Sequence, residues 1–282
     1  MRVTAGDVAL YFDVEGCALV PGGDTMVERP TVVLLHGGPG ADHSLFKPEL
    51  AGLADTAQLV YLDQRGSGRS DAGEPSSWTW GRWADDVADL CAALGIARPV
   101  LAGTSSGGMV AMVCAARHPG LVAGLVLDST LGVPTDLAET LDVFERRGGP
   151  AAREAARRQL SGDTAPEVAE AWARLCLPLY GGSDMPQRRA RARINNDVQE
   201  HFRAGGCGPS DAAAFLPAIT CPVLILAGEH DPVSPAAAAR RLAAALPQAT
   251  LEVFPGVGHG TFRQAPGPAL TAVRQFLARL AQ

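Results

Sequence analysis

The 282-residue chain predicts an α/β fold in which helices cover both faces of a mostly parallel β-sheet. Short apolar runs alternate with segments whose apolar residues recur at helical spacing, which is the pattern of repeated strand–helix units. Some runs, such as Thr31 to Leu35, contain only leucine and β-branched residues, which is typical of parallel strands buried on both faces. A hydrophobic content of 47% is ample for one large core.

The individual elements follow in order from the N-terminus. Residues 8–15 alternate between apolar and polar, which predicts an antiparallel edge strand or hairpin. Within residues 80–94 the apolar side chains share one helical stripe, and Gly95 supplies a C-terminal stop. Buried strands are predicted at residues 31–35, 58–62, 100–103, 125–127, 222–227 and 250–254; helices are predicted at residues 44–54, 80–94, 235–246 and 268–280, with one more that ends at 118–120.

One long segment interrupts this alternation. Residues 131–217, which we call the cap segment, contain helical patterns but no convincing strand. We expect a helical cap inserted between two strands of a core formed by residues 1–130 and 218–282. The arginines at 188, 189, 191 and 193 are balanced by acidic residues, so we expect solvated amphipathic helices and no basic patch.

Composition argues against several classes of partner. A net charge of −6 does not suit nucleic acid or an anionic membrane surface. The N-terminus lacks the apolar run of a signal peptide, and no stretch approaches the ~20 apolar residues of a membrane span. None of the six cysteines lies in a C-x-x-C pair or a metal-like cluster. We expect a cytoplasmic protein without metal or cofactor that acts on a small molecule or short peptide.

Residues 100–110 carry the strongest motif. An apolar strand runs into Gly103-Thr104-Ser105-Ser106-Gly107, and an apolar helix pattern follows. This is the context in which Gly-x-Ser-x-Gly forms a nucleophile elbow, a tight turn that exposes a strained serine. Small residues at 103 and 107 let strand and helix pass closely. The alternative is that the three hydroxyl residues are ordinary polar turn residues.

Two further polar residues follow predicted strands far along the chain. Asp231 follows the strand at 222–227, and His259 follows the last strand. Functional groups gather at the carboxyl ends of parallel strands, and the order Ser105, Asp231, His259 resembles that of the α/β-hydrolase triad. A neutral imidazole can take the serine proton, and the carboxylate orients the ring. Asp128 is a rival acid because it also follows a strand, and His259 could instead be an ordinary loop histidine.

A tetrahedral intermediate needs two aimed hydrogen-bond donors. We assign the backbone N–H groups of Ser106 and Gly38, with Gly37 as the alternative to Gly38. His36 is interpreted as a structural support of this loop. Downstream, Asp63 and Arg65 are expected to form a buried pair that shapes the surroundings of the elbow.

The motifs His36-Gly37-Gly38-Pro39-Gly40 and 63–70 (DQRGSGRS) resemble the proline iminopeptidase branch of the α/β-hydrolases. The glycine-flanked His259 and the segment that contains Asp231 are similar to the base and acid loops of that superfamily. The resemblance covers residues 30–130 and 220–280. It implies an eight-stranded core, a helical cap, no metal, and hydrolysis of peptides or amides that have a free N-terminal residue, often proline.

The sequence departs from this branch at two positions. Ser106 stands where its members usually carry a bulky aromatic residue, and Asn195 stands where they carry a glutamate that binds the substrate's amino group. An amide cannot offer an ammonium group the charge-assisted bond of a carboxylate. Asp197 and Glu200 are the alternative carboxylates for this role.

We therefore expect a cofactor-independent serine hydrolase that works through an acyl-enzyme. Cleavage of small aminoacyl amides of the prolyl type leads narrowly over a carboxylesterase, thioesterase or lactonase. A haloperoxidase-type side activity is compatible with the same triad. The non-enzymatic alternative is a ligand-binding protein on the same fold.

Overall fold

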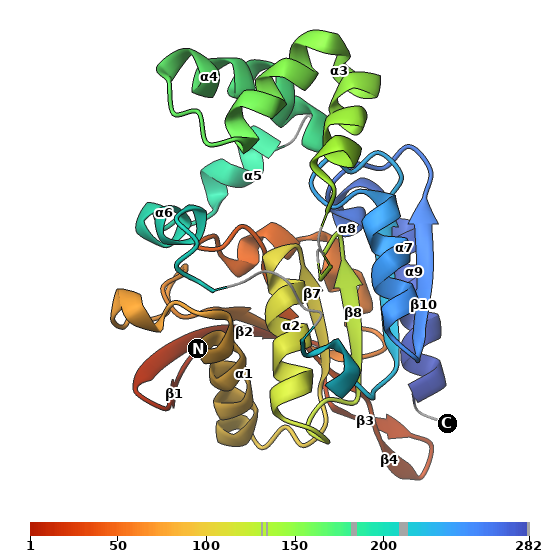
Figure 1. Cartoon of the computed structure of the whole chain (residues 1–282). Helices are drawn as coiled ribbons and strands as arrows, with labels where there is room; N and C mark the ends of the chain where they lie inside the picture. Colours follow the sequence, from red (N-terminus) through yellow and green to blue (C-terminus); the bar gives the residue numbers. More distant parts are fainter. Residues whose placement is uncertain (131, 134, 182–184, 209–213, 281–282) are drawn as a thin grey trace.

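The computed structural model describes residues 1–130, 132–133, 135–181, 185–208 and 214–280. Eight strands form one sheet in the order β1-β2-β6-β5-β7-β8-β9-β10, parallel from β6 onward and antiparallel at the β1–β2 edge (Figure 1). The prediction of a mostly parallel eight-stranded sheet is confirmed. The strands are β1 (Arg2–Ala5), β2 (Val8–Glu15), β5 (Thr31–Leu35), β6 (Gln58–Asp63), β7 (Val100–Thr104), β8 (Gly124–Asp128), β9 (Val223–Gly228) and β10 (Ala249–Phe254).

Two apolar layers cover the sheet, one on each face. Successive residues of β5 alternate between them: Val33 and Leu35 join one layer, and Val32 and Leu34 join the other. The first layer packs beneath α1 (Trp80–Leu94), α2 (Ser106–Arg117) and α7 (Ala236–Ala245). The second packs beneath α8 (Thr261–Gln264) and α9 (Pro266–Leu280). All four residues of β5 that enter these layers are fully buried, as the apolar run predicts.

Helix α1 has the bounds that the sequence predicts. Its first turn is capped by the Thr79 hydroxyl, which accepts the Arg82 N–H. Gly95 ends the helix in the left-handed conformation, with φ +68°. The predicted helix at 44–54 is wrong. That stretch forms two 3₁₀ helices, η1 (His43–Phe46) and η2 (Glu49–Leu53). Pro48 between them has no amide hydrogen and forces the preceding residue into extended backbone, so one continuous helix cannot form.

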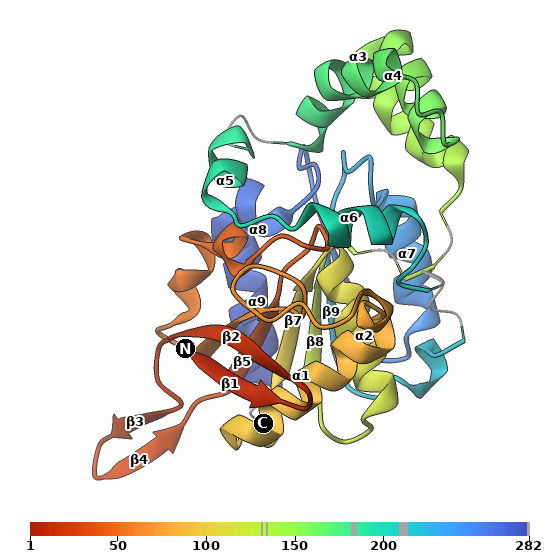
Figure 2. The ribbon, with the colours of Figure 1, turned by 90° about the vertical axis from the view of Figure 1, so that its left-hand side faces the viewer.

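In the described part of the cap segment every regular element is a helix, and that part contains no strand. Figures 1 and 2 show α3 and α4 standing beyond the carboxyl ends of the parallel strands, with α6 lying across those ends. Helix α3 bends where Gly149 adopts φ +77° before Pro150. The elements are α3 (Leu137–Leu160), α4 (Pro166–Ala171), the π-helical turn η4 (Trp172–Cys176), η5 (Leu177–Tyr180), α5 (Met185–Arg191), α6 (Asn196–Arg203) and, across the end of the segment, η6 (Leu216–Ala218).

One arginine of the cap segment departs from the expected solvated face. Arg188 is only 6% exposed, and its guanidinium forms an ion pair with Glu49 of η2. This pair ties α5 to the core, which explains why a cationic side chain is buried at this position.

A second, two-stranded sheet lies apart from the main one. It is the hairpin of β3 (Leu19–Gly22) and β4 (Thr25–Glu28). All four residues of β4 are exposed. Both ribbon views show the hairpin projecting from the end of the molecule opposite α3 and α4 (Figures 1 and 2).

Candidate active site

Ser105 occupies the predicted tight turn between β7 and α2. Its backbone has φ +54° and ψ −121°, a conformation that a non-glycine residue adopts at a cost of roughly 1–3 kcal/mol. Three contacts hold it there: the Ser105 N–H donates to the Asp128 carbonyl at 2.9 Å, and the Ser105 carbonyl accepts the Gly108 N–H at 3.0 Å and the Thr130 hydroxyl at 3.2 Å. The strained conformation predicted for the elbow is confirmed.

The glycines of the elbow are required by close packing. A Cβ atom on Gly103 would overlap the main chain of Gly107, and one on Gly107 would overlap the Leu35 carbonyl. The strand, turn and helix can therefore approach one another only because these positions carry no side chain. This confirms the interpretation of the two small residues.

His259 and Asp231 lie together at the carboxyl ends of the strands. His259 Nδ1 is 2.9 Å from Asp231 Oδ2. Asp231 is fully buried, and its Oδ1 accepts the N–H groups of Val233 and Ser234 at 2.8 and 2.9 Å. Its Oδ2 also accepts the Ser234 hydroxyl at 2.6 Å. These donors fix the carboxylate and leave Oδ2 directed at the imidazole.

The charges of this pair shift both pKa values. Burial disfavours protonation of His259, but the charge and hydrogen bond of Asp231 outweigh it, so the pKa of His259 is raised. Burial likewise disfavours the charged form of Asp231, yet His259 and the Ser234 donors hold the pKa of Asp231 below its usual value. The carboxylate is thus ionised and stabilises an imidazolium beside it.

Asp128, the rival acid, has other partners. It is fully buried, and Oδ1 accepts both the N–H and the hydroxyl of Thr261 at 2.8 Å. Oδ2 accepts the Thr104 hydroxyl at 3.0 Å. Burial raises the pKa of Asp128 despite these donors. Asp128 therefore anchors the start of α8 and the end of β7, whereas the imidazole contact belongs to Asp231.

The glycine-rich loop after β5 lies against the elbow. A Cβ atom on Gly37 would stand 2.7 Å from the Thr104 carbonyl oxygen and 3.0 Å from Ser105 Cβ. Gly38 follows with φ +91°. Within the described residues, neither the Gly38 nor the Ser106 N–H has a hydrogen-bond acceptor, so both donors are available. His36 joins this loop to the chain after β6: it is fully buried, and its Nε2 accepts the Gln64 N–H at 3.2 Å.

The cap residues predicted to bind substrate lie on α6 or at its start. The Asn195 side chain caps α6 by accepting the Asp197 N–H at 3.0 Å and donates to the Gly66 carbonyl at 2.8 Å. It therefore joins the cap segment to the core. Asp197 and Glu200 are exposed, and their carboxylates form no ion pair within the described part of the chain. Between them, Gln199 Nε2 lies 3.4 Å from the Gly38 carbonyl.

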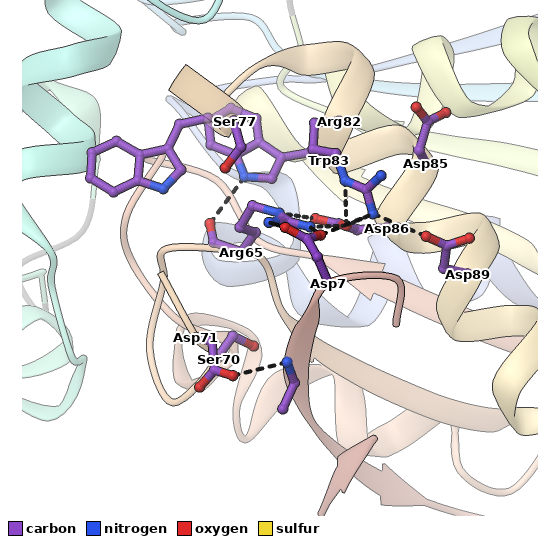
Figure 3. A network of polar contacts seen from close by, with 12 residues as sticks. Asp7, Arg65, Ser70, Asp71, Ser77, Arg82, Trp83, Asp85, Asp86 and Asp89 are labelled. Carbon is purple, nitrogen blue, oxygen red and sulfur yellow. Dashed lines mark hydrogen bonds and ion pairs between the residues drawn. The ribbon is translucent and has the colours of Figure 1, made fainter. Parts of the chain in front are cut away.

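The expected pair of Asp63 and Arg65 is wrong. Asp63 accepts the Nδ1 and backbone N–H of His43 at 2.7 and 2.9 Å. Arg65 is fully buried and forms two 2.8 Å bonds to Asp86 of α1 and a further ion pair with Asp7 (Figure 3). Asp63 is the last residue of β6, whereas Arg65 lies in the turn that follows, where its guanidinium reaches Asp86 and Asp7 instead. The arginine instead ties the loop after β6 to α1.

Residues that the sequence analysis did not single out surround His259. The His259 N–H donates to the Tyr180 carbonyl at 2.7 Å, and the Gln264 side chain donates to the His259 carbonyl at 2.9 Å. A main-chain acceptor has no signature in residue type, so Tyr180 could not be found by pattern. Gln264 lies in the first turn after His259, but nothing in the spacing shows that its side chain folds back.

Two absences within the described residues complete this description. No group of three or more histidine, cysteine, aspartate or glutamate side chains is arranged to hold a metal ion there. No helix in the same ranges is both long enough and apolar enough to cross a membrane.

The fold and the strained elbow define a hydrolase scaffold of the α/β class. The chain belongs to the α/β-hydrolase fold family, whose profile matches residues 30–266.

Relatives within this family have several different specificities. The chain is 30% identical over 280 residues to "Putative carbamate hydrolase RutD" of Caulobacter sp. (strain K31), covering 95% of this chain and 96% of the relative. It is 30% identical over 246 residues to the pimeloyl-[acyl-carrier protein] methyl ester esterase of Chromobacterium violaceum, covering 85% and 91%. The crystal structure of proline iminopeptidase from Mycobacterium smegmatis superposes with a TM-score of 0.76 at 25% identity, covering 99% and 98%. The hydrolase class is common to all three, whereas the bond that is cleaved differs.

Proposed function

We propose that this protein is a serine hydrolase in which Ser105 is the nucleophile, His259 the general base and Asp231 the acid that orients it. The observation that carries the proposal is the 2.9 Å contact between His259 Nδ1 and the buried Asp231 carboxylate at the same sheet edge as the strained Ser105. A proton held at Nδ1 leaves Nε2 as the free base for a serine hydroxyl.

The reaction has two halves. Ser105 Oγ attacks the substrate carbonyl carbon while His259 Nε2 takes the hydroxyl proton, and the backbone N–H groups of Ser106 and Gly38 stabilise the oxyanion. Collapse breaks the bond to the leaving group, which receives the proton from His259. A water molecule then attacks the acyl-enzyme with His259 again as base, releasing the acid and restoring Ser105.

For the substrate, we favour esters of small acyl groups, and we expect the protein to act in the cytoplasm. Asn195 stands at the position where the iminopeptidase branch carries its amine-binding carboxylate, and both functional atoms of its side chain already bind protein groups. A substrate with a charged amino group would find no carboxylate at this position. The similarity to an esterase of Chromobacterium violaceum is consistent with ester cleavage.

The second candidate is hydrolysis of small N-terminal aminoacyl amides of the prolyl type. It is favoured by α6, where Gln199 contacts the Gly38 carbonyl and the exposed carboxylates of Asp197 and Glu200 lie nearby in sequence. The similarity to proline iminopeptidase supports this candidate as well. In this case Asp197 or Glu200 binds the substrate ammonium group.

A paired assay on purified protein and the Ser105→Ala variant tests both candidates. One arm measures short-chain nitrophenyl esters, with thioesters and lactones of equal chain length; the other measures aminoacyl anilides, including the prolyl one. Turnover of esters without anilides supports the esterase, and preferential turnover of the prolyl anilide supports the second candidate. Ser105→Ala should lose at least about 10⁴-fold in kcat on any of them. Activity that survives this substitution refutes the mechanism.

A ligand-binding protein on the same fold is the non-enzymatic alternative. A fluorophosphonate probe distinguishes the two, because it reacts covalently only with an activated serine. Labelling of the folded protein that disappears in Ser105→Ala supports the enzyme. Absence of labelling in the folded wild-type protein supports the binding protein.

A further inference from the structure

The loop that carries His259 is bound to the cap segment through its main chain. The His259 N–H donates to the Tyr180 carbonyl at the end of η5, at 2.7 Å. The Tyr180 ring also packs edge-on against the imidazole, with centroids 5.8 Å apart and an interplanar angle of 72°. The cap segment therefore contacts both the backbone and the ring of the candidate base.

The Gln264 carboxamide of α8 binds both the loop of His259 and the Tyr180 carbonyl. Its Oε1 accepts the Gly258 N–H at 2.9 Å, and its Nε2 donates to the His259 carbonyl at 2.9 Å and to the Tyr180 carbonyl at 3.3 Å. One side chain thus binds the N–H of the residue before His259, the carbonyl of His259 itself and the Tyr180 carbonyl of the cap segment. We call this set of contacts the base clamp.

The chain after Tyr180 is shaped to admit the base clamp. Gly181 has φ +107°, and a Cβ atom at this position would overlap the Gln264 carboxamide. That carboxamide is the end of a flexible side chain, so a methyl group at 181 would displace it, and alanine is also strained at the φ of +107°. Gly181 is therefore a position from which the clamp can be disturbed without touching Gln264.

A second connection reaches the loop of the acid. Arg147 of α3 donates through Nη1 to the Leu179 carbonyl and, at 3.1 Å, to the His230 carbonyl. Burial lowers the pKa of Arg147, although the Asp231 charge opposes this shift. His230, which precedes Asp231, is thus hydrogen-bonded to the cap segment itself. Gly258, which precedes His259, is hydrogen-bonded to Gln264, which contacts the cap segment.

We propose that Gln264 is a positioning residue that couples His259 to Tyr180 at the end of η5, so that the base is aligned with Ser105 only while Tyr180 keeps its contacts with the loop of His259. The inference rests on the proposed function, since it takes His259 as the base. Proton transfer depends on alignment at the sub-ångström scale, and the Asp231 contact fixes only one atom of the imidazole. The base clamp adds a constraint through the main chain, beside the bonds from Arg263 to the His259 carbonyl and from the Gly260 N–H to Ser129.

The first test compares Gln264→Ala with Gln248→Ala. Gln248 is a matched control because its Nε2 also donates to a main-chain carbonyl, that of Thr220 at 2.7 Å, but at the surface and away from the triad. Gln264→Ala should lower kcat on a nitrophenyl ester about 10- to 100-fold with little change in KM, and slow fluorophosphonate labelling of Ser105 to a similar extent. Gln248→Ala should match the wild-type protein in both measurements.

A second pair of variants separates positioning from general loosening of the cap segment. Gly181→Ala should reproduce the kcat loss of Gln264→Ala, because it displaces the same carboxamide. Glu49→Ala breaks the pair with Arg188, which joins α5 of the cap segment to η2 and includes no residue of the base clamp. It should lower the melting temperature but leave kcat and the labelling rate within about twofold, as expected for a contact outside the reacting groups.

The outcomes are separable. If Gln264→Ala does not fold by circular dichroism, Gln264→Glu replaces it: this variant keeps the acceptor for Gly258 and removes the donor to the two carbonyls, and the same kcat loss is expected. Wild-type kcat and labelling in a folded Gln264 variant overturn the inference and leave the proposed function intact. Equal kcat losses in Glu49→Ala and Gln264→Ala also overturn it. Failure of the wild-type protein to label at Ser105 overturns the proposed function itself.

Discussion

Replacement of Asp231 by asparagine probes the acid–base pair at its most constrained point. The carboxylate is fully buried, and its Oδ1 accepts the N–H groups of Val233 and Ser234. An introduced amide must place its oxygen there, because a nitrogen would face two donors. The amide nitrogen then takes the place of Oδ2 and faces the His259 ring. It donates to Nδ1, which moves the imidazole proton to Nε2, where a free base is needed.

The expected loss follows from this change of tautomer. The fold is preserved, but the resting imidazole presents N–H where it should accept the Ser105 proton. We expect kcat to fall about 10⁴-fold, equivalent to 5.4 kcal/mol of barrier. The neutral amide also removes the charge that raises the pKa of His259, so the acid limb of residual activity should move to lower pH.

Steady-state hydrolysis of a nitrophenyl ester between pH 5 and 9 measures both effects, with circular dichroism as the check on folding. Asp128→Asn is the matched control, since Asp128 is an equally buried aspartate at a neighbouring strand end but binds Thr261 and Thr104. It should lower stability while kcat changes less than about tenfold. A loss below tenfold in Asp231→Asn, or equal losses in both variants, would refute the assignment of the acid.

Three further predictions concern pH, the buried ion pair and the elbow. With increasing pH, kcat/KM should rise through a pKa above the ordinary histidine value of 6.5, because the pKa of His259 is raised, and an acid limb below 6.5 would contradict the pairing with Asp231. The stability that the protonated His259 contributes is complete below pH 6.5 and is lost as the pH rises through the pKa of the folded protein. Asp86→Ala removes a carboxylate that neutralises the buried Arg65 guanidinium, so the free energy of unfolding measured in urea should fall by roughly 3–5 kcal/mol. An unchanged urea midpoint would contradict this role of Asp86. Gly103→Ala should prevent the protein from folding and from reacting with the fluorophosphonate probe, because the added methyl group overlaps Gly107. A melting temperature equal to that of the wild-type protein would show that the turn can relax.

Most of the core could be predicted from sequence because its signals are local. A run such as Thr31 to Leu35 is buried on both faces and needs no information about its neighbours to be read as a strand. The elbow is similar, since strand, glycines and helix are contiguous. The failure at 44–54 is also local: Pro48 lies inside the predicted helix, and its missing amide hydrogen decides the backbone.

The candidate site was predictable only in part. Chain order favours Asp231 over Asp128, yet both follow strands, and only three-dimensional packing shows that Asp128 binds Thr261 and not the imidazole. The partners of Arg65 lie at Asp7 and Asp86, distant positions that no spacing rule connects. Gln264 has no signature in the sequence, because a glutamine in a helix is typical of an exposed surface and only the structure shows its side chain folded back onto the loop of His259.

The β3–β4 hairpin offers a handle for attaching the protein to a surface. Among the residues that the structure describes, its strands pair only with each other, and β4 is exposed along its whole length. Gly23 at its tip has open space around the position of a side chain. The hairpin projects from the end opposite α3 and α4 (Figure 2). A cysteine or peptide tag inserted at the tip would fix the molecule to a support with the cap segment turned toward the solution, so that the anchor and the diffusing substrate use opposite ends of the protein.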